Sequence, residues 1–152
     1  MNKKLRMAVD ILMVLQPLSG ILISKHLYTF LPALPVSALA RTVHMLLAYW
    51  GYVLLSVHAG THLVAPLKKL AKNSRAGFGA LAAALGLVSA YGIFAFIKRG
   101  FPGYMTGRTA FAFFDLGEPR AAFFGDYLAI IVLFIMAGCL VIWLLSKNKK
   151  PA

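Results

Sequence analysis

The sequence predicts an all-α protein, a bundle of four transmembrane helices, and three observations predict it. The 152-residue chain is 61% hydrophobic and 13% charged, whereas about a quarter of the residues in an ordinary soluble domain are charged. Four apolar stretches are each long enough, at about 20 residues, to cross the hydrocarbon core of a bilayer. These stretches lack the alternation of apolar and polar residues that marks the strands of a membrane β-barrel, so helices are expected.

The four predicted helices cover approximately residues 7–31, 43–65, 78–97 and 123–145. No internal repeat or low-complexity segment divides them, so residues 1–152 are expected to form a single domain. In the first helix, Ser19 and Gly20 are small enough to let a neighbouring helix or a flat ligand approach closely.

The connections between these helices differ in character. Residues 29–40 contain two prolines and are expected to form a short outer loop, and the basic residues 66–77 an inner loop. The segment between the third and fourth predicted helices, residues 98–126 with the start of the fourth, is long and rich in Phe, Tyr and Gly. Loops of such length are uncommon unless they are functional, and aromatic residues suit the membrane interface. The expected structure is an aromatic-rich outer flap whose inward-pointing residues are Phe111, Phe113 and Phe114.

The distribution of basic residues predicts how the helices cross the membrane. The net charge is +12, but the basic residues gather at helix ends rather than on a soluble face, so no nucleic-acid partner is expected. Cytoplasmic loops carry an excess of Lys and Arg, which predicts that both termini lie inside. His26 and His44 then lie near the outer face. The basic residues on the inner side are Lys3, Lys4, Arg6, Lys68, Lys69, Lys72, Arg75, Lys147, Lys149 and Lys150.

Three of the four histidines lie in the second predicted helix, where histidine is costly and therefore a functional candidate. His58 follows His44 by 14 residues, which places the two side chains roughly 40° apart around a helix and about 21 Å apart along it. One helix can thus present an imidazole near each face of the membrane. Membrane b-type cytochromes hold haem iron with neutral imidazoles arranged in this way.

The histidines predict one haem b site and leave a second incomplete. His26 ends the first helix and His44 begins the second at a similar depth, so the simplest site is an outer haem with both as iron ligands. His58 and His62 share one helix face and cannot lie on opposite sides of one haem. An inner haem at His58 therefore requires a ligand from elsewhere, such as a methionine or a second protomer.

Other uses of the same residues stay open. His58 and His62 can together hold a zinc ion, although no carboxylate or thiol lies near them in sequence to complete the site. Each histidine can also be a hydrogen-bonded packing residue. The rival functions are therefore a haem-free scaffold or assembly subunit and a small transporter with titrating histidines. No catalytic pair, nucleophile triad or phosphate loop is visible, which favours an electron carrier over a stand-alone enzyme.

Three segments of the chain are distinctive: SGILISKHLYTFL (19–31), RTVHMLLAYWGYVLLSVHAGTHL (41–63) and YGIFAFIKRGFPGYMTGRTAFAFFDLGEPRAAFFGDYLA (91–129). They resemble the flavinylation-associated cytochromes, a family of small multi-helix membrane proteins of bacteria. The similarity runs over nearly the whole chain. Its most distinctive parts are the histidine helix and the pattern IKRxFPxYM followed by FFDxxEP.

The resemblance implies a b-type cytochrome in the bacterial inner membrane that passes electrons from the quinone pool, or another inner donor, to an extracytoplasmic flavoprotein. The matching haem-binding positions are His26, His44, His58 and His62. Relatives often carry an additional preceding helix pair with its own histidines, so this chain is expected to work as a homodimer or with another membrane subunit.

Two sets of charged residues in the predicted flap bear on that role. Arg108 and Arg120 suit the docking of an acidic partner. For quinone oxidation, the candidate proton acceptors are Asp115, Glu118 and Asp126, with capping of the fourth helix as the alternative for Asp126.

Overall fold

The computed structural model describes residues 3–24, 37–109, 111–112 and 115–147. The helices in these residues are α1 (Lys3–Ile23), α2 (Ser37–Asn73), α3 (Arg75–Lys98), the short α4 (Phe101–Met105) and α5 (Arg120–Lys147), and no strand occurs among them. Four of the helices, all except α4, are long and apolar enough to span a membrane. The predicted all-α multi-pass membrane protein is confirmed at this level.

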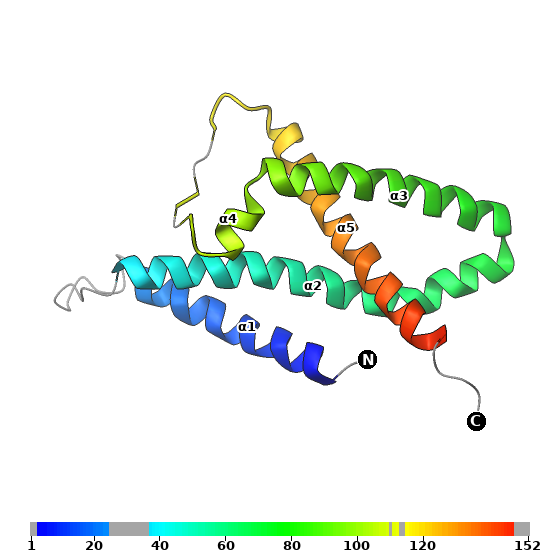
Figure 1. The fold of residues 1–152 in the computed structure, drawn as a ribbon, viewed down its shortest axis with the longest axis horizontal. Helices are drawn as coiled ribbons and strands as arrows, with labels where there is room; N and C mark the ends of the chain where they lie inside the picture. Colours follow the sequence, from blue (N-terminus) through cyan, green and yellow to red (C-terminus); the bar gives the residue numbers. More distant parts are fainter. Residues whose placement is uncertain (1–2, 25–36, 110, 113–114, 148–152) are drawn as a thin grey trace.

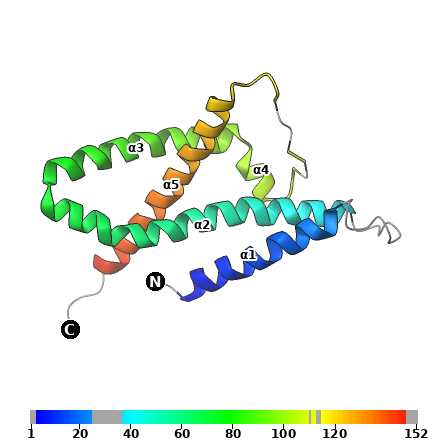
Figure 2. The same ribbon diagram turned by 180° about the vertical axis from the view of Figure 1, so that it is seen from behind.

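The helix α5 holds the molecule together, because it crosses both α2 and α3 obliquely (Figure 1). The helix α1 runs antiparallel beside the first half of α2, on the side away from α3 (Figure 2). The N-terminal end of α1 and the C-terminal end of α5 lie in the half of the molecule that contains the turn between α2 and α3, whereas α4 lies in the other half (Figure 1). This arrangement is the one expected of four successive membrane crossings.

The helix α2 is much longer than the sequence predicted. It begins at Ser37 and ends at Asn73, with Pro66 inside it, so the predicted inner loop of residues 66–77 is helical except at Ser74. A proline removes one backbone hydrogen bond, and the rest of a membrane helix can absorb that loss. At 1.5 Å per residue α2 is about 55 Å long, far more than the ~30 Å hydrocarbon core. The helix α2 is therefore longer than the core, and the basic residues of its C-terminal part suit a position outside the hydrocarbon.

A single serine separates α2 from α3. The Ser74 hydroxyl accepts a hydrogen bond from the backbone nitrogen of Gly77 at 3.1 Å, and its backbone is extended, with φ −149° and ψ 101°. This is the geometry of a helix N-cap. Ser74 therefore ends one long helix and starts the next without a loop.

Glycines allow the helices to cross closely. A Cβ added at Gly60 of α2 would overlap the carbonyl oxygen of Ile135 in α5, and one at Gly138 would overlap that of Val57. At Gly92 of α3 an added Cβ would lie 2.5 Å from the carbonyl oxygen of Ala129. Small residues at crossings let backbones approach closely, and van der Waals packing drives helix association in lipid. The positions of these glycines therefore determine where α5 sits.

The short helix α4 inserts an aromatic side chain that the sequence analysis did not single out. Phe101 is 0% exposed, with its ring centroid 4.7 Å from that of Tyr49 and 5.1 Å from that of Phe96. The preceding Gly100 has φ 68°, a left-handed conformation that glycine adopts readily. The expected inward residue Phe111 is instead 58% exposed. Phe113 and Phe114 lie outside the described residues.

Candidate functional site

His44 of α2 is held by two side chains of α1. Its Nδ1 lies 2.9 Å from the Ser19 hydroxyl oxygen, and its Nε2 lies 3.3 Å from the amide nitrogen of Gln16. A Cβ added at Gly20 would lie 3.4 Å from the Cε1 of His44, so the α1 backbone passes close to the imidazole. The close approach predicted for Ser19 and Gly20 is therefore made by a neighbouring helix.

The contacts of Ser19 link the tautomer of His44 to the position of one hydroxyl hydrogen. The Ser19 hydroxyl lies within hydrogen-bond distance of two acceptors, the backbone oxygen of Gln16 at 2.8 Å and His44 Nδ1 at 2.9 Å. When the hydroxyl hydrogen goes to Gln16, Nδ1 carries the imidazole hydrogen and Nε2 presents its lone pair, to which the Gln16 amide donates. The other amide atom of Gln16, Oε1, is buried with no hydrogen-bond partner among the described residues.

This donor arrangement fits haem iron in its chemistry. An imidazole that ligates a metal commonly donates its second N–H to a neighbouring oxygen, which orients the ring and strengthens it as a ligand. Ser19 supplies that oxygen for His44, and Nε2 is left to ligate. The space beside Nε2 is limited. The Gln16 amide nitrogen contacts Nε2, and the adjoining cavity between α1 and α2 has a volume of only 260 Å³. Ligation at Nε2 therefore requires the Gln16 side chain to move away.

His58 and His62 lie together further along α2. Their ring centroids are 4.9 Å apart and their planes are inclined by 69°, as expected for residues one turn apart on one helix. The Nδ1 of His58 is buried with no hydrogen-bond partner among the described residues. An imidazole nitrogen in that state is costly unless a hydrogen bond or a ligand satisfies it.

The structure does not place all the predicted ligands together. His26 lies outside the described residues, so the expected pair of His26 and His44 stays a prediction. In the described parts of the chain, no group of three His, Cys, Asp or Glu side chains is arranged to hold a metal ion. His44 and His58 lie on one uninterrupted helix, which keeps the predicted separation of about 21 Å.

A cluster of charged side chains joins α3 to α5, and sequence analysis did not predict it. Asp126 is 1% exposed and binds the Lys98 ammonium at 2.9 Å and the Arg99 guanidinium at 2.7 Å. Tyr91 also donates a hydrogen bond to Asp126. Asp126 lies seven residues into α5, so the expectation that it caps this helix is wrong.

Glu118 completes this charged cluster from the segment that precedes α5. Its carboxylate forms a two-pronged pair with Arg99, with nitrogen–oxygen distances of 2.6 and 2.5 Å. The hydrogen bonds from Arg99 hold the pKa of Glu118 below its usual value, and those to Glu118 and Asp126 raise the pKa of Arg99. Two cations and two carboxylates balance, so the cluster is a neutral clamp. The cluster is poorly suited to accept a proton in quinone chemistry, because both of its carboxylates are already paired with cations.

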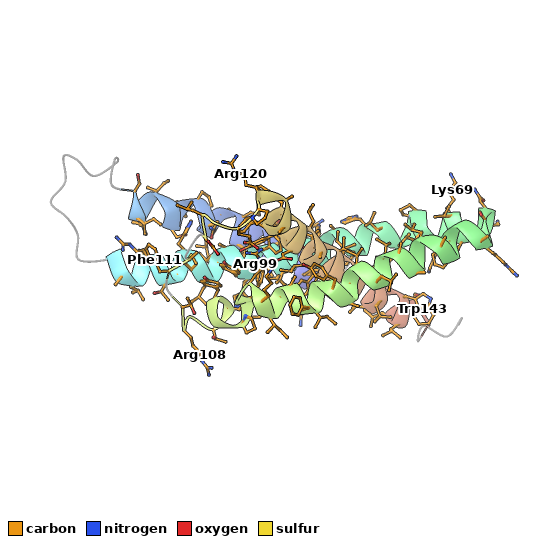
Figure 3. The ribbon with its side chains drawn as sticks, turned by 90° about the horizontal axis from the view of Figure 1, so that it is seen from above. Lys69, Arg99, Arg108, Phe111, Arg120 and Trp143 are labelled. Carbon is orange, nitrogen blue, oxygen red and sulfur yellow. The ribbon has the colours of Figure 1, made fainter. Side chains whose placement is uncertain are left out.

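The two arginines proposed for partner docking are exposed and project to opposite sides of the molecule (Figure 3). Arg99, in contrast, points inward to the charged cluster of Lys98, Arg99, Glu118 and Asp126. A partner that contacts Arg108 and Arg120 together must therefore cover the whole end of the bundle that carries α4.

Comparison with known proteins identified no relative of this chain. No family model matches the chain, and no curated protein and no solved structure matches it significantly. The resemblance to the flavinylation-associated cytochromes therefore stays a prediction from the sequence motifs.

Proposed function

We propose that this protein is a b-type cytochrome-like electron-transfer subunit of the bacterial inner membrane. Both termini face the cytoplasm, and α4 with the segment around Arg108 faces outward. His44 is the iron ligand near the outer face, with His26 as its partner, and His58 is the candidate ligand of an inner site. Electrons pass outward to an extracytoplasmic flavoprotein, with the quinone pool as donor.

The observation that carries this proposal is the hydrogen-bond chain from Gln16 O through Ser19 to His44 Nδ1. With the Ser19 hydrogen on Gln16, the chain leaves the Nε2 lone pair of His44 to ligate once the Gln16 side chain moves away, inside a helix long enough to span a membrane. When bound, haem supplies a one-electron carrier, while the protein provides the ligand, its orientation and an apolar surrounding that excludes water.

A second candidate is a haem-free scaffold subunit, and one observation favours it. Both ring nitrogens of His44 lie within hydrogen-bond distance of α1 side chains, so His44 is also able to do no more than fasten α1 to α2. In lipid, side-chain hydrogen bonds across helices contribute about 0.6–2 kcal/mol each. The two candidates differ in whether Nε2 ever leaves Gln16.

A reduced-minus-oxidised absorbance spectrum with haem quantified per chain tests the proposal. The purified protein is expected to show the bands of low-spin b haem, and His44→Ala is expected to lose the outer haem. Gln16→Ala frees Nε2 and should retain or raise haem content, whereas His62→Ala should leave the outer haem in place. Protein without a Soret band would favour the haem-free scaffold instead. Full haem in both His26→Ala and His44→Ala would overturn the assignment of these two histidines as ligands of the outer haem.

A further inference from the structure

A second and larger cavity lies at the opposite end of the bundle from α4. It has a volume of 520 Å³ and opens between α2, α3 and α5 near the turn at Ser74. Its lining is apolar, with Leu67, Phe78, Leu85 and Met136 contributed by the three helices. The exceptions to this apolar character are Lys68, the one charged residue that lines it, and the indole of Trp143.

The surroundings of this cavity are strongly basic. Lys68, Lys69, Lys72 and Arg75 lie within eight residues of one another, and the sequence contains no Asp or Glu between residues 11 and 114. The described salt bridges of the chain all lie at the other end, between α3, α5 and Glu118. Neighbours in sequence therefore do not neutralise this group of cations, and an anion from outside the chain is favoured.

The shape and depth of the cavity select the kind of anion. The helix α2 is longer than the hydrocarbon core, and its clustered cations favour the headgroup region, so we infer headgroup depth for Lys68. Trp143 on α5 is 48% exposed at the same end of the molecule (Figure 3). Tryptophan favours this interfacial depth. A soluble anion would leave the apolar lining unused, and a second copy of this chain would bring the same four cations face to face. A lipid with an anionic headgroup suits both parts of the site, because its acyl chain matches the apolar lining and its headgroup matches the cations.

We propose that this cavity binds an anionic glycerophospholipid, with one acyl chain between α2, α3 and α5 and the phosphate on Lys68. Basic pockets between membrane helices bind anionic headgroups through the same combination of charge and apolar contact. The bound lipid fills the space that the oblique crossing of α5 leaves between α2 and α3. This site is independent of haem, because no histidine lines it.

Quenching of Trp143 fluorescence by brominated lipids tests the proposal in the full-length protein. The background is Trp50→Phe, which leaves Trp143 as the single tryptophan. In mixed vesicles, brominated phosphatidylglycerol is expected to quench at a severalfold lower mole fraction than brominated phosphatidylcholine. A lysine near anionic headgroups favours binding about fivefold, so Lys68→Gln should reduce the preference by about that factor.

Two control variants, one matched to Lys68→Gln and one to Ala82→Leu, distinguish a specific lipid site from general attraction of anionic lipid to the basic surface. Lys69→Gln makes the same change in charge one residue away, outside the cavity lining, and should keep most of the preference. Ala82→Leu narrows the cavity and should weaken quenching by both lipids, while Ala83→Leu, which does not line it, should not. Equal loss of preference in Lys68→Gln and Lys69→Gln, or no preference in the parent protein, would overturn the proposal.

Discussion

At the residue scale, the single hydroxyl hydrogen of Ser19 governs the imidazole of His44. If Ser19 can only accept from Nδ1, the Nδ1–H tautomer should dominate in protein without haem. Nitrogen-15 NMR of labelled histidine reads this directly. Ser19→Ala leaves the Nδ1 hydrogen without its partner, which costs about 1–3 kcal/mol for a buried group, so the tautomers should mix and the melting temperature should fall.

Ser89→Ala is the matched control for this prediction. The Ser89 hydroxyl donates to the backbone oxygen of Leu85 at 2.7 Å within its own helix and touches no histidine in the described structure. Its replacement should leave the histidine spectrum unchanged. A spectrum of the parent protein dominated by the Nε2–H tautomer would contradict the assignment.

Also at the residue scale, Glu118 makes stability depend on pH. Its pKa is lowered in the folded protein by the hydrogen bonds from Arg99, so its contribution is present above the unfolded pKa of about 4.3 and is lost as pH falls through the lower, folded value. Thermal unfolding should show Glu118→Gln less stable than the parent at pH 7, with the difference shrinking below about pH 4.

The control for that pH effect is Asp115→Asn. The Asp115 carboxylate accepts a hydrogen bond from the backbone nitrogen of Gly117 at 2.8 Å, and asparagine can keep this bond. Its effect on stability at pH 7 should therefore be small. A Glu118→Gln difference that stays constant down to pH 3 would show that the pair with Arg99 does not form.

At the element scale, the crossing of α3 and α5 depends on Gly92. Adding a methyl group there meets the backbone of Ala129, and overpacking of this kind costs about 1–3 kcal/mol. Gly86 lies on the same helix with nothing within 4 Å of an added Cβ, so Gly86→Ala should be neutral or slightly stabilising through its helix propensity. Thermal unfolding in detergent should therefore rank Gly92→Ala well below Gly86→Ala.

The sequence was sufficient to predict the membrane-spanning helices but not how they pack against one another. Hydrophobic length predicts a span, because the bilayer sets one dimension for every helix. Hydrophobic length does not predict that α2 continues through Pro66. It also does not predict that Asp126 of α5 pairs with Lys98 and Arg99. Both features depend on tertiary contacts. The spacing of His44 and His58 was predictable, since both lie on one helix. The contact of His44 with Ser19 depends on how α1 docks.

At the scale of the whole molecule, the predicted topology is open to a direct test. In a Cys139→Ser background, Thr106→Cys at the α4 end and Lys69→Cys at the basic end introduce one thiol each at exposed positions. A membrane-impermeant maleimide should label Thr106→Cys in intact cells and Lys69→Cys only after lysis. The reverse pattern would place both termini outside and invert the depth of every histidine.

The crossing of α5 over α2 and α3 has a consequence for biogenesis. The helices α2 and α3 touch each other far less than each touches α5, yet α5 is synthesised after both of them. A nascent chain that ends before Arg120 therefore has Gly60 and Gly92 facing lipid with no backbone to pack against. Assembly of the bundle must await the synthesis of α5, and a chain truncated before Arg120 should be recognised by membrane quality control as unassembled.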